Sequence, residues 1–206
     1  MISDLDLCLL CNKTYSSSAS LPIPKSGVYV CTTQVRDGIV VAFRGSITEQ
    51  DWLRDGKTIP RQARNHPQLG YCHDGFLSAG ESIVNEVVKA VGNQPLIITG
   101  HSLGGAEAVA VGALLTLMKK PIAKIVTFGA PRVGMWEFVK VMNAVRALRQ
   151  YRRGNDPVPM VPFFIPIIFR YRNTRDPLIQ IGKDQPNAFD AHHITGYVED
   201  MHSTPN

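Results

Sequence analysis

The chain has 206 residues, of which 44% are hydrophobic and 19% are charged, and its formal net charge at pH 7 is +5. A chain of this length and composition is expected to form one globular domain over residues 1–206, and its apolar content excludes a largely disordered protein. The Lys and Arg residues are scattered rather than gathered in one run, so no nucleic-acid partner is expected.

The N-terminal segment Met1–Leu10 carries two aspartates and no Lys or Arg. It lacks the pattern of a signal peptide, so a cytoplasmic location is expected. The pair Cys8 and Cys11 stands without a second cysteine pair, which argues against a zinc site. The longest apolar run, Met160–Phe169, is too short for a membrane-spanning helix, and no transmembrane helix is expected.

Two runs rich in β-branched residues, Gly27–Thr33 and Ile39–Phe43, predict neighbouring strands of one sheet. Between them lies the turn sequence Arg36-Asp37-Gly38. Because Asp-Gly is a strong short-range signal for a hairpin, these strands are expected to pair with each other.

The next elements alternate between helix and strand. Phe76–Val91 places apolar residues at helical spacing and is followed by Gly92, a plausible helix stop. Pro95–Thr99 is a short continuous apolar run, which is typical of a strand buried on both faces of a parallel sheet. A helix is predicted over Gly104–Met118 directly after it.

A second buried strand is predicted over Ile122–Phe128, followed by a helix over Met135–Ala147 and a strand over Leu148–Arg152. Strands that alternate with helices in this way form right-handed βαβ units. The sequence therefore predicts an α/β fold with a mostly parallel central sheet flanked by helices.

The residues between the strand Pro95–Thr99 and the following helix read Gly-His-Ser-Leu-Gly. A strand that turns directly into a helix holds its turn residue in a strained conformation, and Gly100 and Gly104 remove side chains that would collide there. This pattern is typical of a nucleophile elbow, with Ser102 exposed at the end of the strand. The N–H of Leu103, at the helix N-terminus, is the expected first donor to an oxyanion.

A serine nucleophile needs a histidine base and a carboxylate that orients it, in the chain order Ser, acid, His for this kind of elbow. Asp156 is the best acid because it lies in a loop directly after the predicted strand Leu148–Arg152. His192 and His193 follow Asp156, and position alone does not choose between them as the base.

Six short segments carry a more specific signal than the elbow alone. They are Phe43–Ser46 (FRGS) with Asp51-Trp52, His73–Phe76 (HDGF), Thr99–Ala106 (TGHSLGGA), Phe128–Gly134 (FGAPRVG), Asn155–Pro159 (NDPVP), and His192 with Tyr197. In this order they resemble the class 3 lipase family, the α/β-hydrolases typified by fungal triacylglycerol lipases. The resemblance implies an α/β-hydrolase fold and a serine carboxylic-ester hydrolase, a lipase or esterase, that forms an acyl-enzyme on lipid or small acyl esters without a metal or organic cofactor.

The resemblance also implies roles for single residues. Ser46 is expected to give a second oxyanion donor through its backbone N–H, opposite Leu103. The spacing from His192 to Tyr197 is similar to that of family members and favours His192 over His193 as the base. His101 is expected to be a packed structural histidine.

Some interpretations stay open. Ile47–Asp55, where relatives carry a lid, is short and polar, which favours an esterase-like cleft. Ile167–Tyr171 is interpreted as a core strand, whereas Phe163–Ile165 either packs in the core, lines an acyl groove or makes transient contact with a membrane surface. Glu107 is expected to interact with the helix dipole. An acyltransferase with the same triad and a catalytically silent binding module are the alternative functions.

Overall fold

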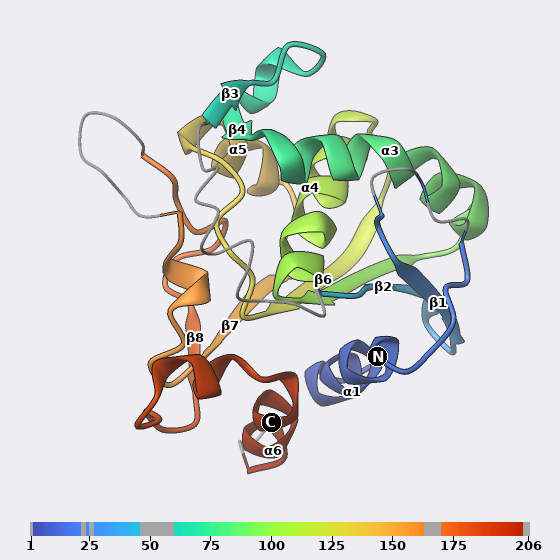
Figure 1. The fold of residues 1–206 in the computed structure, drawn as a ribbon. Coiled ribbons are helices and arrows are strands. Elements are labelled where there is room, and N and C mark those ends of the chain that lie inside the picture. The colour runs from blue at the N-terminus through green and yellow to red at the C-terminus, as the bar shows by residue number, and fades with distance from the viewer. Residues whose placement is uncertain (1, 22–23, 25–26, 46–59, 163–169, 204–206) are drawn as a thin grey trace.

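The computed structural model describes residues 2–21, 24, 27–45, 60–162 and 170–203 (Figure 1). The elements along the chain are α1 (Asp4–Thr14), β1 (Val30–Val35), β2 (Gly38–Phe43), β3 (Pro60–Gln62), η1 (Pro67–Leu69), β4 (Tyr71–His73), α3 (Asp74–Val91), β5 (Leu96–His101), α4 (Leu103–Leu117), β6 (Ile122–Phe128), α5 (Trp136–Met142), β7 (Leu148–Arg153), η2 (Val158–Met160), β8 (Ile179–Ile181), η3 (Ala188–His192) and α6 (Ile194–Ser203).

The main sheet has the strand order β1-β2-β5-β6-β7-β8. The pair β1–β2 is antiparallel, and β2, β5, β6, β7 and β8 run parallel to their neighbours. Helices α3, α4 and α5 lie on one side of this sheet, and α1 and α6 lie on the other (Figure 1). The predicted mostly parallel sheet flanked by helices is therefore confirmed.

The predicted hairpin is also confirmed. Val30 pairs with Phe43 and Val35 pairs with Gly38, so the Asp-Gly turn closes the two strands as expected. Every residue of β2 and of β5 is buried, because helices cover both faces of the sheet at its centre.

Helix α1 was not predicted from the sequence. It begins at a capping box in which Ser3 and Asp6 bond each other's backbone N–H groups. Its buried Asp4 forms ion pairs with Lys124 on β6 and Arg149 on β7, and accepts a hydrogen bond from Tyr151 at 2.7 Å. These bonds attach the N-terminal segment to the face of the sheet opposite α3, α4 and α5.

Helix α5 is shorter than the predicted Met135–Ala147. After Met142 the chain tightens into turns in which Ala144 N–H bonds the carbonyl oxygen of Val141 and Val145 N–H bonds that of Met142. Within the described ranges, no helix has both the length and the apolar content to cross a bilayer.

Three predicted segments fall wholly or mostly outside the described residues. Ile47–Asp55 and Phe163–Ile165 are among them. Of the expected core strand Ile167–Tyr171, only Arg170 and Tyr171 are described, and the next residue, Arg172, forms an isolated bridge with Gly134.

Candidate active site

Ser102 is the single residue between β5 and α4, and its backbone has the unusual angles φ 55° and ψ −130°. The turn is possible because two glycines flank it. A Cβ at Gly100 would lie 2.5 Å from the carbonyl carbon of Gly104, and one at Gly104 would lie 2.6 Å from that of Arg44. Such strain is typical of a residue that the surrounding structure holds for function.

The three residues expected to form a triad lie together. His192 Nε2 is 2.8 Å from Ser102 Oγ, and His192 Nδ1 is 2.8 Å from Asp156 Oδ2. Ser102 comes from the β5–α4 turn, Asp156 from the loop after β7, and His192 from the end of η3. An imidazole with Nδ1–H on a carboxylate presents Nε2 as an acceptor to the serine hydroxyl, which is what proton removal requires.

All three residues are buried: Ser102 and Asp156 are 0% exposed and His192 is 1% exposed. The expectation that the elbow leaves Ser102 exposed is therefore wrong. The Ser102 hydroxyl faces His192, and Ser102 packs near Gly45, where a Cβ would lie 3.2 Å from the Ser102 Cβ. The elbow presents the hydroxyl to the His192 ring rather than to bulk water.

The Asp156 carboxylate has further donors besides His192. Oδ1 accepts from Val158 N–H at 2.9 Å, and Oδ2 accepts from the Tyr197 hydroxyl at 2.6 Å. The Tyr197 oxygen in turn accepts from Arg153 N–H at 3.0 Å. Burial and the nearby Asp156 charge raise the pKa of Tyr197 well above its ordinary value, so this phenol remains a donor. These bonds fix the carboxylate in one orientation.

His101 is buried beside the triad, and its ring centroid lies 4.8 Å from that of His192. Nε2 donates to the carbonyl oxygen of His192 at 2.8 Å, and Nδ1 accepts from the Tyr15 hydroxyl at 2.7 Å. Burial lowers the pKa of His101 well below its ordinary value, and His192 and His193 lower it further. A neutral ring here does not repel a proton gained by His192.

Tyr15 was missed in the sequence, because it follows the unpredicted helix α1 in a stretch with no motif. The contact between Tyr197 and Asp156 was also missed, although the spacing from His192 to Tyr197 was a usable signal for it. Tyr197 donates to Asp156, a member of the expected triad, and Tyr15 donates to His101, which bonds the His192 backbone.

Three further residues were predicted for the site: His193 as the alternative base, and Leu103 and Ser46 as oxyanion donors. His193 is exposed, whereas the buried ring of His192 is the one that lies at hydrogen-bond distance from Ser102 Oγ. Leu103 is the first residue of α4, where backbone N–H groups have no partner within a helix. Ser46 lies outside the described residues.

Glu107, for which an interaction with the helix dipole is expected from the sequence, lies in the second turn of α4 and is 6% exposed. Burial raises its pKa from 4.5 to about 8. Asn173 Oδ1 accepts a hydrogen bond from Arg132 Nε at 3.1 Å. In the part of the chain that the structure describes, no group of three or more His, Cys, Asp or Glu residues could hold a metal ion.

Comparisons with known proteins agree with this architecture. The sequence model of the family described as Lipase (class 3) matches residues 40–165, which is more than half of the chain. The secreted mono- and diacylglycerol lipase 1 of Fusarium solani is 35% identical over 156 residues, covering 72% of this chain and 45% of that protein. The crystal structure of the Lip2 lipase of Yarrowia lipolytica matches with a TM-score of 0.63 at 20% identity, covering 89% of this chain and 78% of that chain, which confirms the predicted α/β-hydrolase fold.

A second fungal relative, the secreted mono- and diacylglycerol lipase A of Penicillium cyclopium, is 28% identical over 146 residues, covering 65% of this chain and 46% of that protein. The chain thus spans slightly less than half the length of these curated relatives.

The expectation of a cytoplasmic location is wrong, because both relatives are named as secreted and point to an extracellular location. That expectation rested in part on the two aspartates of Met1–Leu10. In the structure, Asp6 belongs to the capping box of α1 and Asp4 forms an ion pair with Lys124. Because the family model matches more than half of this chain, the chain belongs to the class 3 lipase family.

Proposed function

We propose that this chain is a serine carboxylic-ester hydrolase, a lipase or esterase, that acts on lipid or small acyl esters through Ser102, His192 and Asp156. The observation that carries the proposal is the continuous path from the Asp156 carboxylate through the His192 ring to the Ser102 hydroxyl, with 2.8 Å at each step. Both distances are short enough for direct hydrogen bonds between ionisable partners.

In the first half of the reaction Ser102 Oγ attacks the carbonyl carbon of the ester, and its proton passes to His192 Nε2. Asp156 stabilises the imidazolium through Nδ1–H. The tetrahedral intermediate then expels the alcohol, which takes the proton from Nε2, and leaves an acyl group on Ser102. Water, deprotonated by His192, attacks this acyl-enzyme and releases the carboxylic acid.

The oxyanion that forms in each half is stabilised by two backbone N–H groups, those of Leu103 and Ser46. The place of Leu103 at the start of α4 supports the first donor, because the helix dipole adds partial positive charge there. The second donor is supported by Gly45, which precedes Ser46 in the chain and packs near Ser102.

The relatives support a lipid substrate. Two of them are named mono- and diacylglycerol lipases, so acylglycerols are the substrate class we propose for this chain. Ser102 would attack the carbonyl carbon of a small ester in the same way as that of an acylglycerol. p-Nitrophenyl esters are therefore suitable soluble substrates for testing the proposed activity.

The test is to compare the unaltered chain with Ser102→Ala, using Ser203→Ala, at an exposed serine, as the control. We expect a fluorophosphonate probe to label the chain and the control but not Ser102→Ala, and p-nitrophenyl butyrate hydrolysis to follow the same pattern. Absence of labelling in the unaltered chain would indicate a silent binding module. Acyl transfer to added glycerol in place of acid release would indicate an acyltransferase.

A further inference from the structure

Two large aromatic side chains are half exposed on adjacent segments at one end of the fold. Trp136, the first residue of α5, is 51% exposed, and Tyr71, in β4, is 48% exposed. The segments are joined because Met135 N–H donates to the carbonyl oxygen of Tyr71 at 3.1 Å. Amphipathic rings of this kind are enriched where proteins meet the headgroup region of a membrane.

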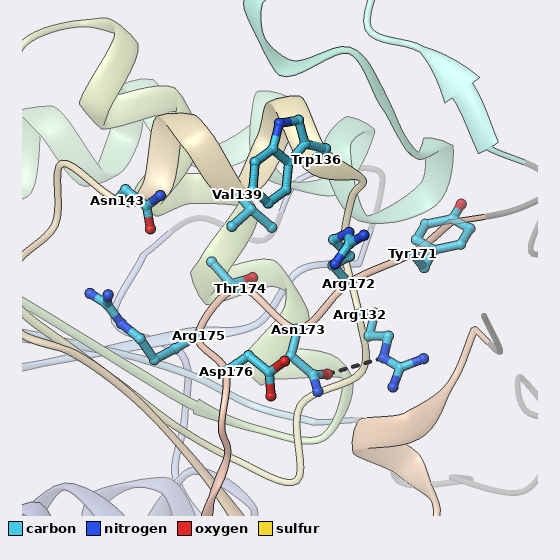
Figure 2. Close-up of a pocket in the computed structure, with 10 residues that line it drawn as sticks. All are labelled: Arg132, Trp136, Val139, Asn143, Tyr171, Arg172, Asn173, Thr174, Arg175 and Asp176. Carbon is cyan, nitrogen blue, oxygen red and sulfur yellow. Dashed lines mark hydrogen bonds between the residues drawn. The ribbon is translucent and has the colours of Figure 1, made fainter. Parts of the chain in front are cut away.

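Two cations lie against the Trp136 ring. The Arg172 guanidinium carbon is 5.3 Å from the ring centroid and Lys140 Nζ is 5.6 Å from it. In the view of Figure 2 the Arg172 guanidinium lies between Trp136 and the bonded pair of Arg132 and Asn173. The Trp136 ring and two cations thus occupy the same patch of surface, beside the segment that carries Tyr71.

Beside this patch is a pocket of about 420 Å³, which Trp136 and Arg172 help to line. The guanidiniums of Arg132 and Arg175 also line it, from opposite ends (Figure 2). Its volume falls in the range of roughly 300–1,000 Å³ that is usual for small-molecule sites.

The charges of this region do not cancel. Among the described residues, the pocket lining holds three arginines, Arg132, Arg172 and Arg175, and one carboxylate, that of Asp176, while α5 carries Lys140 and Glu137. Within the described residues, none of the four cations forms an ion pair.

Arg132 shows the imbalance most clearly. It is 9% exposed, and its hydrogen bonds reach only neutral groups, Asn173 Oδ1, the Pro162 carbonyl oxygen and Met160 Sδ. Burial lowers the pKa of Arg132, and the charge of Asp176, which lines the same pocket, partly opposes this shift. Burying a cation whose hydrogen bonds reach only neutral groups is costly, and an anion that enters the pocket offsets this cost.

We propose that the Trp136 face, defined as Tyr71, Trp136, Lys140 and Arg172, docks onto an anionic phospholipid surface, with a lipid phosphate received by the pocket beside it. The rings enter the headgroup layer while Lys140 and Arg172 meet phosphate oxygens. This proposal rests on the proposed function in so far as a lipase meets its substrate at a lipid surface, but docking is measured without turnover.

The first experiment measures binding of the full chain to phosphatidylglycerol vesicles by co-sedimentation. The double variant K140Q/R172Q is compared with K120Q/K183Q, which removes the same charge at exposed lysines elsewhere. Each cation near an anionic surface strengthens binding by a similar increment, and the increments of two cations multiply in the affinity. We therefore expect the vesicle affinity of K140Q/R172Q to fall about 30-fold and that of K120Q/K183Q to change by less than about threefold. Equal losses in both variants would overturn the proposal, because net charge alone would then explain binding.

The second experiment uses tryptophan fluorescence. The sequence has two tryptophans, Trp52 and Trp136. In the variant Trp52→Phe, we expect the emission of Trp136 to shift to the blue on addition of phosphatidylglycerol vesicles and to be quenched by brominated phosphatidylglycerol. Unchanged emission at saturating lipid would overturn docking through this face.

Hydrolysis of soluble p-nitrophenyl butyrate separates this proposal from the proposed function. We expect all the surface variants to keep it. Loss of vesicle binding with intact hydrolysis in K140Q/R172Q supports the docking face. A chain that hydrolyses the soluble ester but never binds vesicles refutes docking alone, whereas a chain that binds vesicles but hydrolyses nothing refutes the proposed function alone.

Discussion

His101 Nε2 donates a hydrogen bond to the carbonyl oxygen of His192 at 2.8 Å, so the residue before the nucleophile holds the backbone of the proposed base. A carbonyl oxygen only accepts, which places the proton of His101 on Nε2. Nδ1 is then an acceptor, and the Tyr15 hydroxyl donates to it at 2.7 Å. The segment after α1 is connected by this path to the triad.

Removal of the Tyr15 hydroxyl is expected to weaken both the fold and the proposed activity. In Tyr15→Phe the buried Nδ1 of His101 loses its donor, and an unsatisfied buried acceptor costs about 1–3 kcal/mol. We expect the free energy of unfolding in urea to fall by this amount, and kcat for p-nitrophenyl butyrate to fall by about tenfold with little change in KM. Tyr71→Phe, which removes the same atom from a half-exposed ring, is the control, and equal effects in the two variants would contradict this role of Tyr15.

The elements around Ser102 could be predicted because each has a local signal. The continuous apolar run before the elbow and the small apolar helix after it placed the ends of β5 and α4 within two residues of those observed. Asp156 could be chosen because the end of a strand in a parallel sheet is itself a local feature. These predictions needed no knowledge of which segments pack together.

Other features depend on packing between distant segments and left no trace in the sequence pattern. Helix α1 packs against α6 as well as against the sheet, and it buries Asp4 in ion pairs, so its pattern of apolar residues is not that of a simple amphipathic helix. Which of His192 and His193 meets Ser102 depends on how η3 lies over the sheet. The burial of Ser102 likewise follows from contacts with Gly45 and His192.

A side chain added at Gly129 is expected to displace the triad. Gly129 has φ 60°, and a Cβ there would lie 2.9 Å from His192 Cε1 and 3.0 Å from Asp156 Oδ2. Because a shift of about 1 Å in a catalytic group costs on the order of 100-fold, we expect Gly129→Ala to lower kcat by at least that factor. Gly92→Ala is a matched control, since Gly92 has φ 58° with no atom near its added Cβ. The two variants share the backbone strain, so comparable kcat values would show that the contact with the triad is unimportant.

Asp156→Asn is expected to lower kcat about 10³- to 10⁴-fold without unfolding the chain. The amide keeps the size of the carboxylate but does not stabilise an imidazolium, and its N–H₂ group favours the wrong tautomer of His192. Hydrolysis of p-nitrophenyl butyrate, together with circular dichroism, measures both effects. Asp184→Asn, at an exposed aspartate that is also downstream of Ser102, serves for comparison and should retain full activity. An active Asp156→Asn variant would remove Asp156 from the proposed mechanism.

The buried Glu107 predicts an unusual dependence of stability on pH. Burial raises its pKa from 4.5 to about 8, so between these values the folded chain keeps a proton that the unfolded chain has lost. Stability therefore falls as pH rises through this window, by about 1.4 kcal/mol per pH unit from this one group, and the full cost is present above the folded pKa. Glu107→Gln carries no titrating carboxyl. We expect urea unfolding to give similar free energies for the two chains at pH 4, and a growing advantage of Glu107→Gln from pH 5 to pH 8. A difference that stays constant across this range would mean that the Glu107 carboxyl ionises in the fold as it does in water.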